Sequence, residues 1–339
     1  MHIKCESGFD ERPSTSTTEG RPCDAKSDIW ENKPRANQML SFHWLEKESI
    51  YSMSYPNLCA FKECPEHLQS NEYILHGYRV DFSKLQCIKS IFMLTNETIN
   101  VWSHLLGVIF FLYALIRVNF KVLVCYELST PADHIVMSLF CLCFMTCLLL
   151  STFYHIFSCH SKEYYECCLR FDLMGISLSL WGCYIPSIYY GFYCFKIWRT
   201  FYTAAVVMMM LLNMAFQICP KRVYTQKTDY RRVIFFVLMC LFGVFPAIHW
   251  VYILGLSNAL VLTFIPKVVM MYVFGLIAFI FYITKIPEKL KPGWFDYIGS
   301  SHQLWHIAVL AAMIWWYFTA LEFIELRLHS KHSCALDIV

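Results

Sequence analysis

Residues 135–157 read IVMSLFCLCFMTCLLLSTFYHIF, a run that contains no Asp, Glu, Lys or Arg. A stretch of about 17 to 25 apolar residues is long enough to cross a bilayer as a helix. Six more stretches of this kind follow the same pattern, at about 101–119, 171–193, 200–219, 233–254, 267–284 and 303–324. The sequence therefore predicts an all-α membrane protein built as a bundle of seven transmembrane helices.

The composition supports a membrane protein. Of the 339 residues, 57% are hydrophobic and only 16% are charged, whereas soluble globular proteins carry about 25% charged residues. The net charge of +3 comes from scattered residues, so the clustered basic face of a nucleic-acid-binding protein is missing. Most of the 17 cysteines lie in apolar runs (for example Cys141, Cys143, Cys147, Cys183 and Cys240), where we interpret them as small packing residues.

The chain before the first span divides into two parts. Residues 1–39 are polar and lack apolar periodicity, which predicts a disordered cytosolic extension. Residues 40–99 mix aromatic and charged side chains and are expected to form a cytosolic region with a partner-binding surface. The bundle is expected over residues 100–325, and a lumenal tail over 326–339. No secretory signal peptide is apparent, so we expect the first membrane helix to direct targeting.

A short amphipathic helix is predicted within residues 83–94. Leu85, Ile88 and Phe92 share one helical face, opposite Lys84 and Lys89. This pattern is typical of a helix that lies in the membrane interface. An ordinary helix packed under the bundle explains the same pattern equally well, and the sequence leaves both interpretations open.

The orientation of the bundle follows from the positive charges that flank the spans, since cytosolic loops carry the excess of Lys and Arg. Seven such residues lie on the side of the C-terminus: Arg117, Lys121, Lys196, Arg199, Lys267, Arg327 and Lys331. Thirteen lie on the side of the N-terminus: Arg79, Lys84, Lys89, Lys162, Arg170, Lys221, Arg222, Lys227, Arg231, Arg232, Lys285, Lys289 and Lys291. We therefore expect a cytosolic N-terminus and a lumenal or extracellular C-terminus.

This topology places several polar residues at one depth, near the cytosolic ends of three spans. His302 and His306 are four residues apart, so they point to the same side of a helix and can bind one ion. His155 from another span would complete three ligands for Zn²⁺ with an open fourth position, as in catalytic zinc sites. Ser151, one turn before His155, is expected to hold the water or orient a ligand, and Asp172 to act as ligand, water partner or general base.

Other polar residues receive simpler interpretations. His104 and His160 are interpreted as structural, and His249 lies near the opposite face of the membrane. Asn96-Glu-Thr98 is a glycosylation acceptor that should stay unmodified on the cytosolic side, and we expect Thr95 or Asn96 to be a helix N-cap. Prolines inside the predicted spans (Pro186, Pro246 and Pro266) are able to kink their helices.

Four motifs carry a family resemblance. They are Asn96-Glu-Thr-Ile-Asn-Val-Trp-Ser-His-Leu-Leu-Gly107, Ser151-Thr-Phe-Tyr-His155, Phe171-Asp-Leu-Met-Gly-Ile176 and Ser300-Ser-His-Gln-Leu-Trp-His306. Together they resemble the progestin and adipoQ receptor family. The resemblance implies a seven-helix bundle with a cytosolic N-terminus. It also implies zinc held by His155, His302 and His306, with Asp172 and Ser151 near the metal's water.

Within this family, stretches such as Gly77-Tyr-Arg79 and Pro246-Ala-Ile-His-Trp-Val251 resemble a Golgi member that traps Raf kinase. The resemblance implies a multi-pass Golgi protein that tethers a Raf-type kinase through residues 40–94 and restrains mitogen-activated kinase signalling. A competing hypothesis is a zinc-dependent amide hydrolase of ceramide-like membrane lipids, an activity proposed for some relatives. A hormone receptor of the plasma membrane is a weaker alternative, because the outward loops and tail are short.

Overall fold

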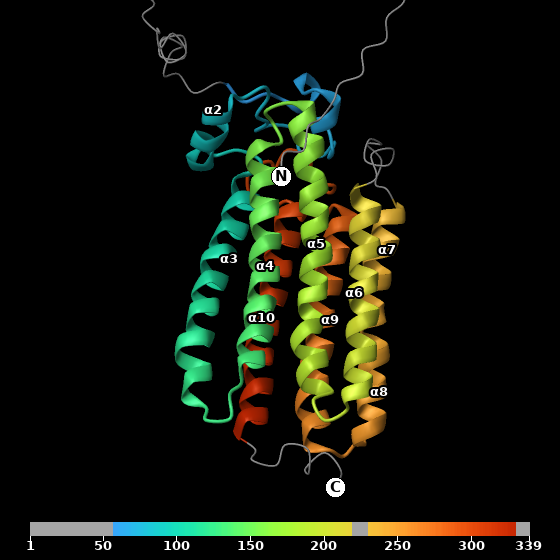
Figure 1. Ribbon diagram of the computed structural model, residues 1–339. Coiled ribbons are helices and arrows are strands. Elements are labelled where there is room, and N and C mark those ends of the chain that lie inside the picture. The colour runs from blue at the N-terminus through green and yellow to red at the C-terminus, as the bar shows by residue number, and fades with distance from the viewer. Residues whose placement is uncertain (1–56, 219–229, 330–339) are drawn as a thin grey trace, which may run out of the picture. The chain divides into compact units, whose positions relative to one another are not determined.

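The structure, a computed structural model, describes residues 57–218 and 230–329 (Figure 1). The predicted disorder of residues 1–39, the first part of the 40–99 region and most of the predicted tail lie outside the described residues. The structural account therefore concerns the end of the N-terminal region and the bundle.

The regular elements of these two ranges are helices, and seven of their helical stretches are long and apolar enough to span a membrane. The first span runs through α3 (Thr98–Arg117), η4 (Val118–Val122) and η5 (Leu123–Cys125), and the fifth through α7 (Tyr230–Phe242) and α8 (Val244–Leu254). The other five are α4 (Pro131–Phe157), α5 (Lys162–Gly191), α6 (Lys196–Ile218), α9 (Ala259–Thr284) and α10 (Ser301–His329). The predicted seven-helix fold is confirmed, and α10 ends at the opposite end of the bundle from residue 57 (Figure 1).

Several helices extend beyond the apolar runs because polar residues cap and begin them. The helix α5 begins at Lys162, well before the predicted start at residue 171, and the Ser161 hydroxyl accepts a hydrogen bond from the Tyr164 N–H at 3.3 Å. At the start of α4, Thr130 and Asp133 form a capping box and Pro131 occupies the first turn. Apolar content alone therefore underestimates the helix lengths.

The start of α3 differs from the prediction. The N-cap is Glu97, so the expectation of Thr95 or Asn96 as N-cap is wrong. The Thr95 hydroxyl instead accepts a hydrogen bond from the Glu97 N–H at 3.2 Å, and Thr98 Oγ1 accepts one from the Thr95 N–H at 2.8 Å. These bonds form a turn before the helix, and the Glu97 side chain is left available for another contact.

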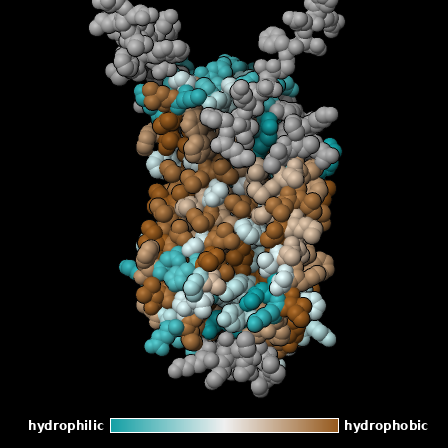
Figure 2. Space-filling model, viewed as in Figure 1, coloured by the Kyte–Doolittle hydropathy of each residue, from teal (hydrophilic) through white to brown (hydrophobic). Residues whose placement is uncertain are grey.

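The centre of the bundle is formed mainly by α4 and α10. In the most apolar stretch of each of these two helices about half of the residues are buried, 50% in α4 and 56% in α10, whereas the corresponding share in α9 is 11%. Buried aromatic side chains pack between them and α3, including Phe111, Phe144 and Tyr317. The outward-facing residues are mostly apolar and form a brown surface around the middle of the bundle (Figure 2), as expected for contact with lipid tails.

The fifth span is broken at Gly243, close to the kink predicted at Pro246. At the break the Gly243 N–H donates to the Cys240 carbonyl at 3.2 Å rather than to the Met239 carbonyl four residues back, so the regular helical bonding is interrupted. Tyr184 from α5 donates its hydroxyl to the Met239 carbonyl, and Tyr272 from α9 donates to the Cys240 carbonyl at 2.9 Å. Both hydroxyls pass close to the position that a Cβ would take at Gly243, which explains the glycine.

Residues 57–97 fold over one end of the bundle, and we call them the cap (Figure 1). The cap contains the short helices η1 (Phe61–Glu63), η2 (Glu66–Leu68), α2 (Lys84–Lys89) and η3 (Ser90–Phe92). It is fastened to the α9–α10 loop, because Asp296 accepts hydrogen bonds from the Leu75 N–H at 2.8 Å and contacts His76 Nδ1 at 3.0 Å. The cap is therefore attached to the bundle rather than separate from it.

The predicted amphipathic helix is present as α2 and η3. Ser83 is the N-cap of α2, and Cys87 is its buried residue. Leu85, Ile88 and Phe92 are all exposed, so they do not pack under the bundle. Of the two interpretations that the sequence left open, the exposed apolar face agrees with the interfacial helix.

The cysteines follow the prediction with one exception. Cys141, Cys143, Cys147, Cys183 and Cys240 are free thiols within the spans, as packing residues should be. Cys194, which follows α5 at the end opposite the cap, is disulfide-bonded.

Candidate metal centre

Three histidine side chains converge inside the bundle near its cap end. His155 lies in the last turn of α4, and His302 and His306 lie in the first two turns of α10. The Nε2 atom of His306 is 3.1 Å from Nε2 of His155 and 3.3 Å from Nε2 of His302. All three offer ligand atoms within 4.8 Å of one another, which makes them a group able to hold a metal ion.

Glu97 orients the His155 ring. Its Oε2 atom lies 2.7 Å from His155 Nδ1 and also accepts a hydrogen bond from Asn100 at 2.6 Å. Burial alone would raise the pKa of Glu97, but the neighbouring His155, Arg79 and Asn100 side chains lower the pKa to about 2. The ionised carboxylate therefore accepts a hydrogen bond from His155 Nδ1–H, which leaves the Nε2 lone pair directed at the other two histidines.

Arg79 from the cap holds the backbone beside His155. The guanidinium is buried and donates to the carbonyl groups of His155 and Ile156, the latter at 3.2 Å. It also donates to the Ser90 hydroxyl at 2.6 Å, and Ser90 in turn donates to the Cys87 carbonyl. A buried cation thus joins the cap directly to the end of α4.

His104 of α3 is in contact with the metal centre. Its ring stacks on His306 with 3.9 Å between centroids. It is buried, and neither of its ring nitrogens has a hydrogen-bond partner within the described ranges. His104 is outside the group that could hold a metal ion, and its ring packs against His306 of that group.

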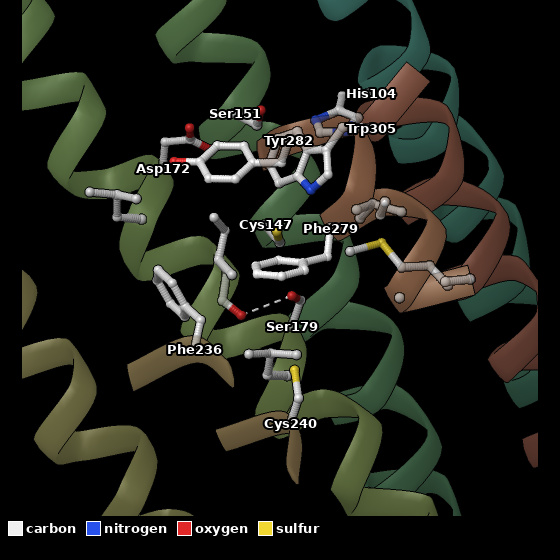
Figure 3. Close-up of a pocket in the computed structure, with 18 of the residues that line it drawn as sticks. His104, Cys147, Ser151, Asp172, Ser179, Phe236, Cys240, Phe279, Tyr282 and Trp305 are labelled. Carbon is white, nitrogen blue, oxygen red and sulfur yellow. Dashed lines mark hydrogen bonds between the residues drawn. The ribbon is translucent and has the colours of Figure 1, made fainter. Parts of the chain in front are cut away.

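Asp172 and Ser151 lie side by side at the head of a large cavity (Figure 3). Asp172 comes from α5 and Ser151 from α4, one turn before His155. The cavity has a volume of about 1840 Å³ and is bordered by His155 and His302 at the site. His155, His302, Asp172 and Ser151, which the sequence places at one depth in the membrane, therefore border one cavity.

Beyond the site the cavity becomes apolar. Phe236, Cys240 and Phe279 line its middle, below Asp172 and Ser151 in Figure 3, and Trp250, Phe264 and Phe323 line it further from the cap. A space of this shape fits a molecule with a polar head near the histidines and an apolar tail along the bundle.

The other histidines singled out in the sequence, His160 and His249, lie outside the metal centre. His160 contacts the Phe82 carbonyl at 2.8 Å, and His249 contacts the Tyr202 hydroxyl at 2.9 Å, so both have structural partners away from the site. Sequence reasoning missed Glu97 and Arg79. Glu97 is the middle residue of the glycosylation motif Asn96-Glu-Thr98, and the motif was interpreted without it. An acidic residue at the start of a membrane span is nevertheless a signal that its carboxylate has a buried polar partner.

Comparison with known proteins agrees with this geometry. The sequence profile of the haemolysin-III-related family matches residues 92–317, which include all three histidines. Progestin and adipoQ receptor family member 3 of Mus musculus is 40% identical over 279 residues, or 81% of this chain and 88% of the relative. The chain belongs to the progestin and adipoQ receptor family. The Homo sapiens member 3 has the same identity and coverage, and heptahelical transmembrane protein 1 of Arabidopsis thaliana is 34% identical over 82% of the chain and 84% of that relative.

Proposed function

We propose that this chain is a zinc-dependent amide hydrolase that acts on ceramide-like lipids within the membrane. The observation that carries the proposal is the position of three converging histidines and an acid at the polar head of a long apolar cavity. Ceramide-like lipids have the matching form, since an amide lies between a polar head and long apolar chains.

The three histidines fit zinc. Zinc–nitrogen bonds of about 2.0–2.1 Å in a tetrahedron imply nitrogen–nitrogen separations of about 3.3 Å. Two of the separations in the structure, 3.1 and 3.3 Å, match this value, and the ligand atoms of all three histidines lie within 4.8 Å of one another. Three nitrogens would leave one open coordination position, which catalytic zinc sites require.

The chain's own residues supply the rest of the chemistry. Zinc held by these histidines would supply a Lewis acid for an amide carbonyl and would make a bound water more acidic. The Asp172 carboxylate is placed to take a proton from the attacking water and return it to the leaving amine, while the Ser151 hydroxyl holds Asp172 in position. The apolar cavity walls exclude bulk water and align the lipid chains.

The test is hydrolysis of a fluorescent ceramide analogue by the purified full chain. Asp172→Asn is nearly isosteric, so it should abolish hydrolysis while zinc content stays close to one per chain. Asp81→Asn is the matched control, because Asp81 is exposed in the cap and has a positive φ of 54° that asparagine tolerates. Hydrolysis that persists in Asp172→Asn would refute the assigned role, and the absence of zinc-dependent hydrolysis from the native chain would refute the enzyme.

We propose as a second function that the cytosolic N-terminal region, residues 40–94, tethers a Raf-type kinase to Golgi membranes and restrains mitogen-activated kinase signalling. The similarity to family member 3 and the folded, firmly attached cap favour it. The two functions are compatible because they use different parts of the chain. The charge split and the disulfide at Cys194 both support a cytosolic cap.

The contact between Arg79 and the end of α4 limits which deletions can test the tether. A deletion that reaches residue 80 would remove the contact that holds His155, so it would disturb both functions. Deletion of residues 1–56 spares the cap, and charge reversal of the exposed Lys62 and Glu72 alters only its surface. We expect one of these two changes to reduce Raf recruitment to Golgi membranes without loss of zinc, and full recruitment in both would contradict the tether.

A further inference from the structure

Two stretches at the cap end expose large apolar side chains beside lysines. The first, residues 83–94, exposes Leu85, Ile88 and Phe92, with 80% of Phe92 accessible. The second, residues 285–298 between α9 and α10, exposes Leu290, Trp294 and Ile298, with 76% of Trp294 accessible. We call these stretches the α2 anchor and the loop anchor. Neither one takes part in the metal centre.

Both anchors lie at the level where spans leave the bilayer. In the α2 anchor, the Ile91 carbonyl accepts a hydrogen bond from Trp102 Nε1 at 2.9 Å, and the Phe92 and Trp102 rings are 5.9 Å apart. Trp102 belongs to the second turn of α3, the first membrane span. The loop anchor follows directly from Thr284, the last residue of α9. Figure 2 shows apolar side chains over the α2 region, continuing above the apolar belt.

The exposed charges of the anchors are all positive. Lys84 and Lys89 are exposed in the α2 anchor, which contains no acidic residue, and Lys289 and Lys291 are exposed in the loop anchor. The two acids of the loop anchor, Glu288 and Asp296, are buried. Glu288 accepts the Ser301 N–H at 2.7 Å, and Asp296 accepts the Leu75 N–H, so these carboxylates do not offset the lysines at the surface.

We propose that the α2 and loop anchors bind the anionic phospholipid headgroups of the leaflet that surrounds the cap. Their apolar residues enter the boundary between headgroups and acyl chains, and Lys84, Lys89, Lys289 and Lys291 contact headgroup phosphates and carboxylates. A membrane surface suits both features, because apolar side chains flanked by lysines are typical of interfacial segments and tryptophan is enriched at this depth. This seating fixes the height of the cap and the cavity mouth relative to the bilayer.

The binding should depend on lipid charge and on salt. A lysine near an anionic surface contributes about 1 kcal/mol, which corresponds to about a fivefold change in an equilibrium constant. Each anchor has two such exposed lysines, so removal of both, at about 1 kcal/mol each, should change its protection by about 30-fold. The attraction between a lysine and the anionic surface decays over about one Debye length, which is about 8 Å at physiological ionic strength.

Hydrogen–deuterium exchange of the full chain in lipid nanodiscs tests the proposal. The discs contain phosphatidylcholine alone, or the same lipid with phosphatidylserine or with a phosphoinositide at equal surface charge. We expect slower exchange of peptides 83–94 and 285–298 in both anionic discs, reversed by high salt. Equal slowing by the two lipids would support recognition of charge alone, and stronger slowing by the phosphoinositide would support recognition of phosphate.

Lysine variants make the test specific to each anchor. Lys84→Gln/Lys89→Gln should remove the slowing in peptide 83–94 and leave it in 285–298, and Lys289→Gln/Lys291→Gln should do the reverse. Lys121→Gln is the control, because Lys121 is exposed at the opposite end of the bundle. Exchange that is the same in neutral and anionic discs, or slowing that survives the lysine substitutions, would overturn the proposal.

Discussion

Replacement of Glu97 by glutamine tests whether this residue supports a metal ligand. The carboxylate lies 2.7 Å from His155 Nδ1, and it fixes the tautomer that directs Nε2 at the other histidines. Glutamine has nearly the same shape but lacks the negative charge. Loss of such a supporting contact typically weakens metal affinity by 10- to 100-fold.

The size of the effect on stability follows from the loss of affinity. When free zinc is well above the dissociation constant, the stabilisation is RT ln(1 + [L]/Kd), so a 30-fold weaker affinity removes about 2 kcal/mol. The unfolding temperature in excess zinc should therefore fall in Glu97→Gln, and the difference should shrink after chelation.

Competition with a chromogenic chelator measures the affinity directly, and thermal unfolding with and without zinc measures the stability. Glu72→Gln is the matched control, since Glu72 is an exposed glutamate of the same cap. A zinc affinity in Glu97→Gln within twofold of the native value would refute the idea that Glu97 orients a metal ligand.

Three further predictions concern packing, thiol reactivity and topology. Gly243→Ala should destabilise the chain by about 1–3 kcal/mol in thermal unfolding, because the new Cβ would lie 2.6 Å from the Tyr272 hydroxyl, whereas Gly275→Ala, with open space around it, should be neutral or slightly stabilising. Burial, with Cys59 and Glu63 nearby, raises the pKa of the Cys64 thiol to about 11, so little of this thiol is ionised at pH 8. Its alkylation rate, measured by mass spectrometry, should therefore rise up to about pH 11 and stay below that of the exposed Cys167. In sealed Golgi vesicles, an added protease should remove an N-terminal tag and spare a C-terminal one, and the opposite pattern would contradict the assigned orientation.

The sequence predicts the fold well because membrane spans follow from composition alone. Apolar runs of sufficient length specify the number of helices, but their ends depend on local polar residues such as the N-cap Ser161, which hydropathy does not detect. The break at Gly243 illustrates the same limit. Pro246 indicates a kink in this span, but the contacts at the break come from Tyr184 and Tyr272, two residues of other helices that no local pattern reveals.

The convergence of the three histidines was predictable for a related reason. A pair four residues apart in α10 and a third histidine at the same depth require only helix geometry and topology. The supporting contacts of Glu97 and Arg79 were not predictable, because the cap has no periodic pattern that indicates where it meets the bundle. The Glu97–His155 contact joins residues 58 positions apart in the chain, and only the folded structure brings them together.

Zinc analysis of the purified chain tests the central claim most directly. The native protein should contain about one zinc ion per chain, His306→Ala should contain almost none, and Asp172→Asn should retain it, since Asp172 is outside the group of three histidines that could hold the ion. Full zinc occupancy in His306→Ala, or a native protein that binds no zinc at micromolar free concentration, would contradict the account.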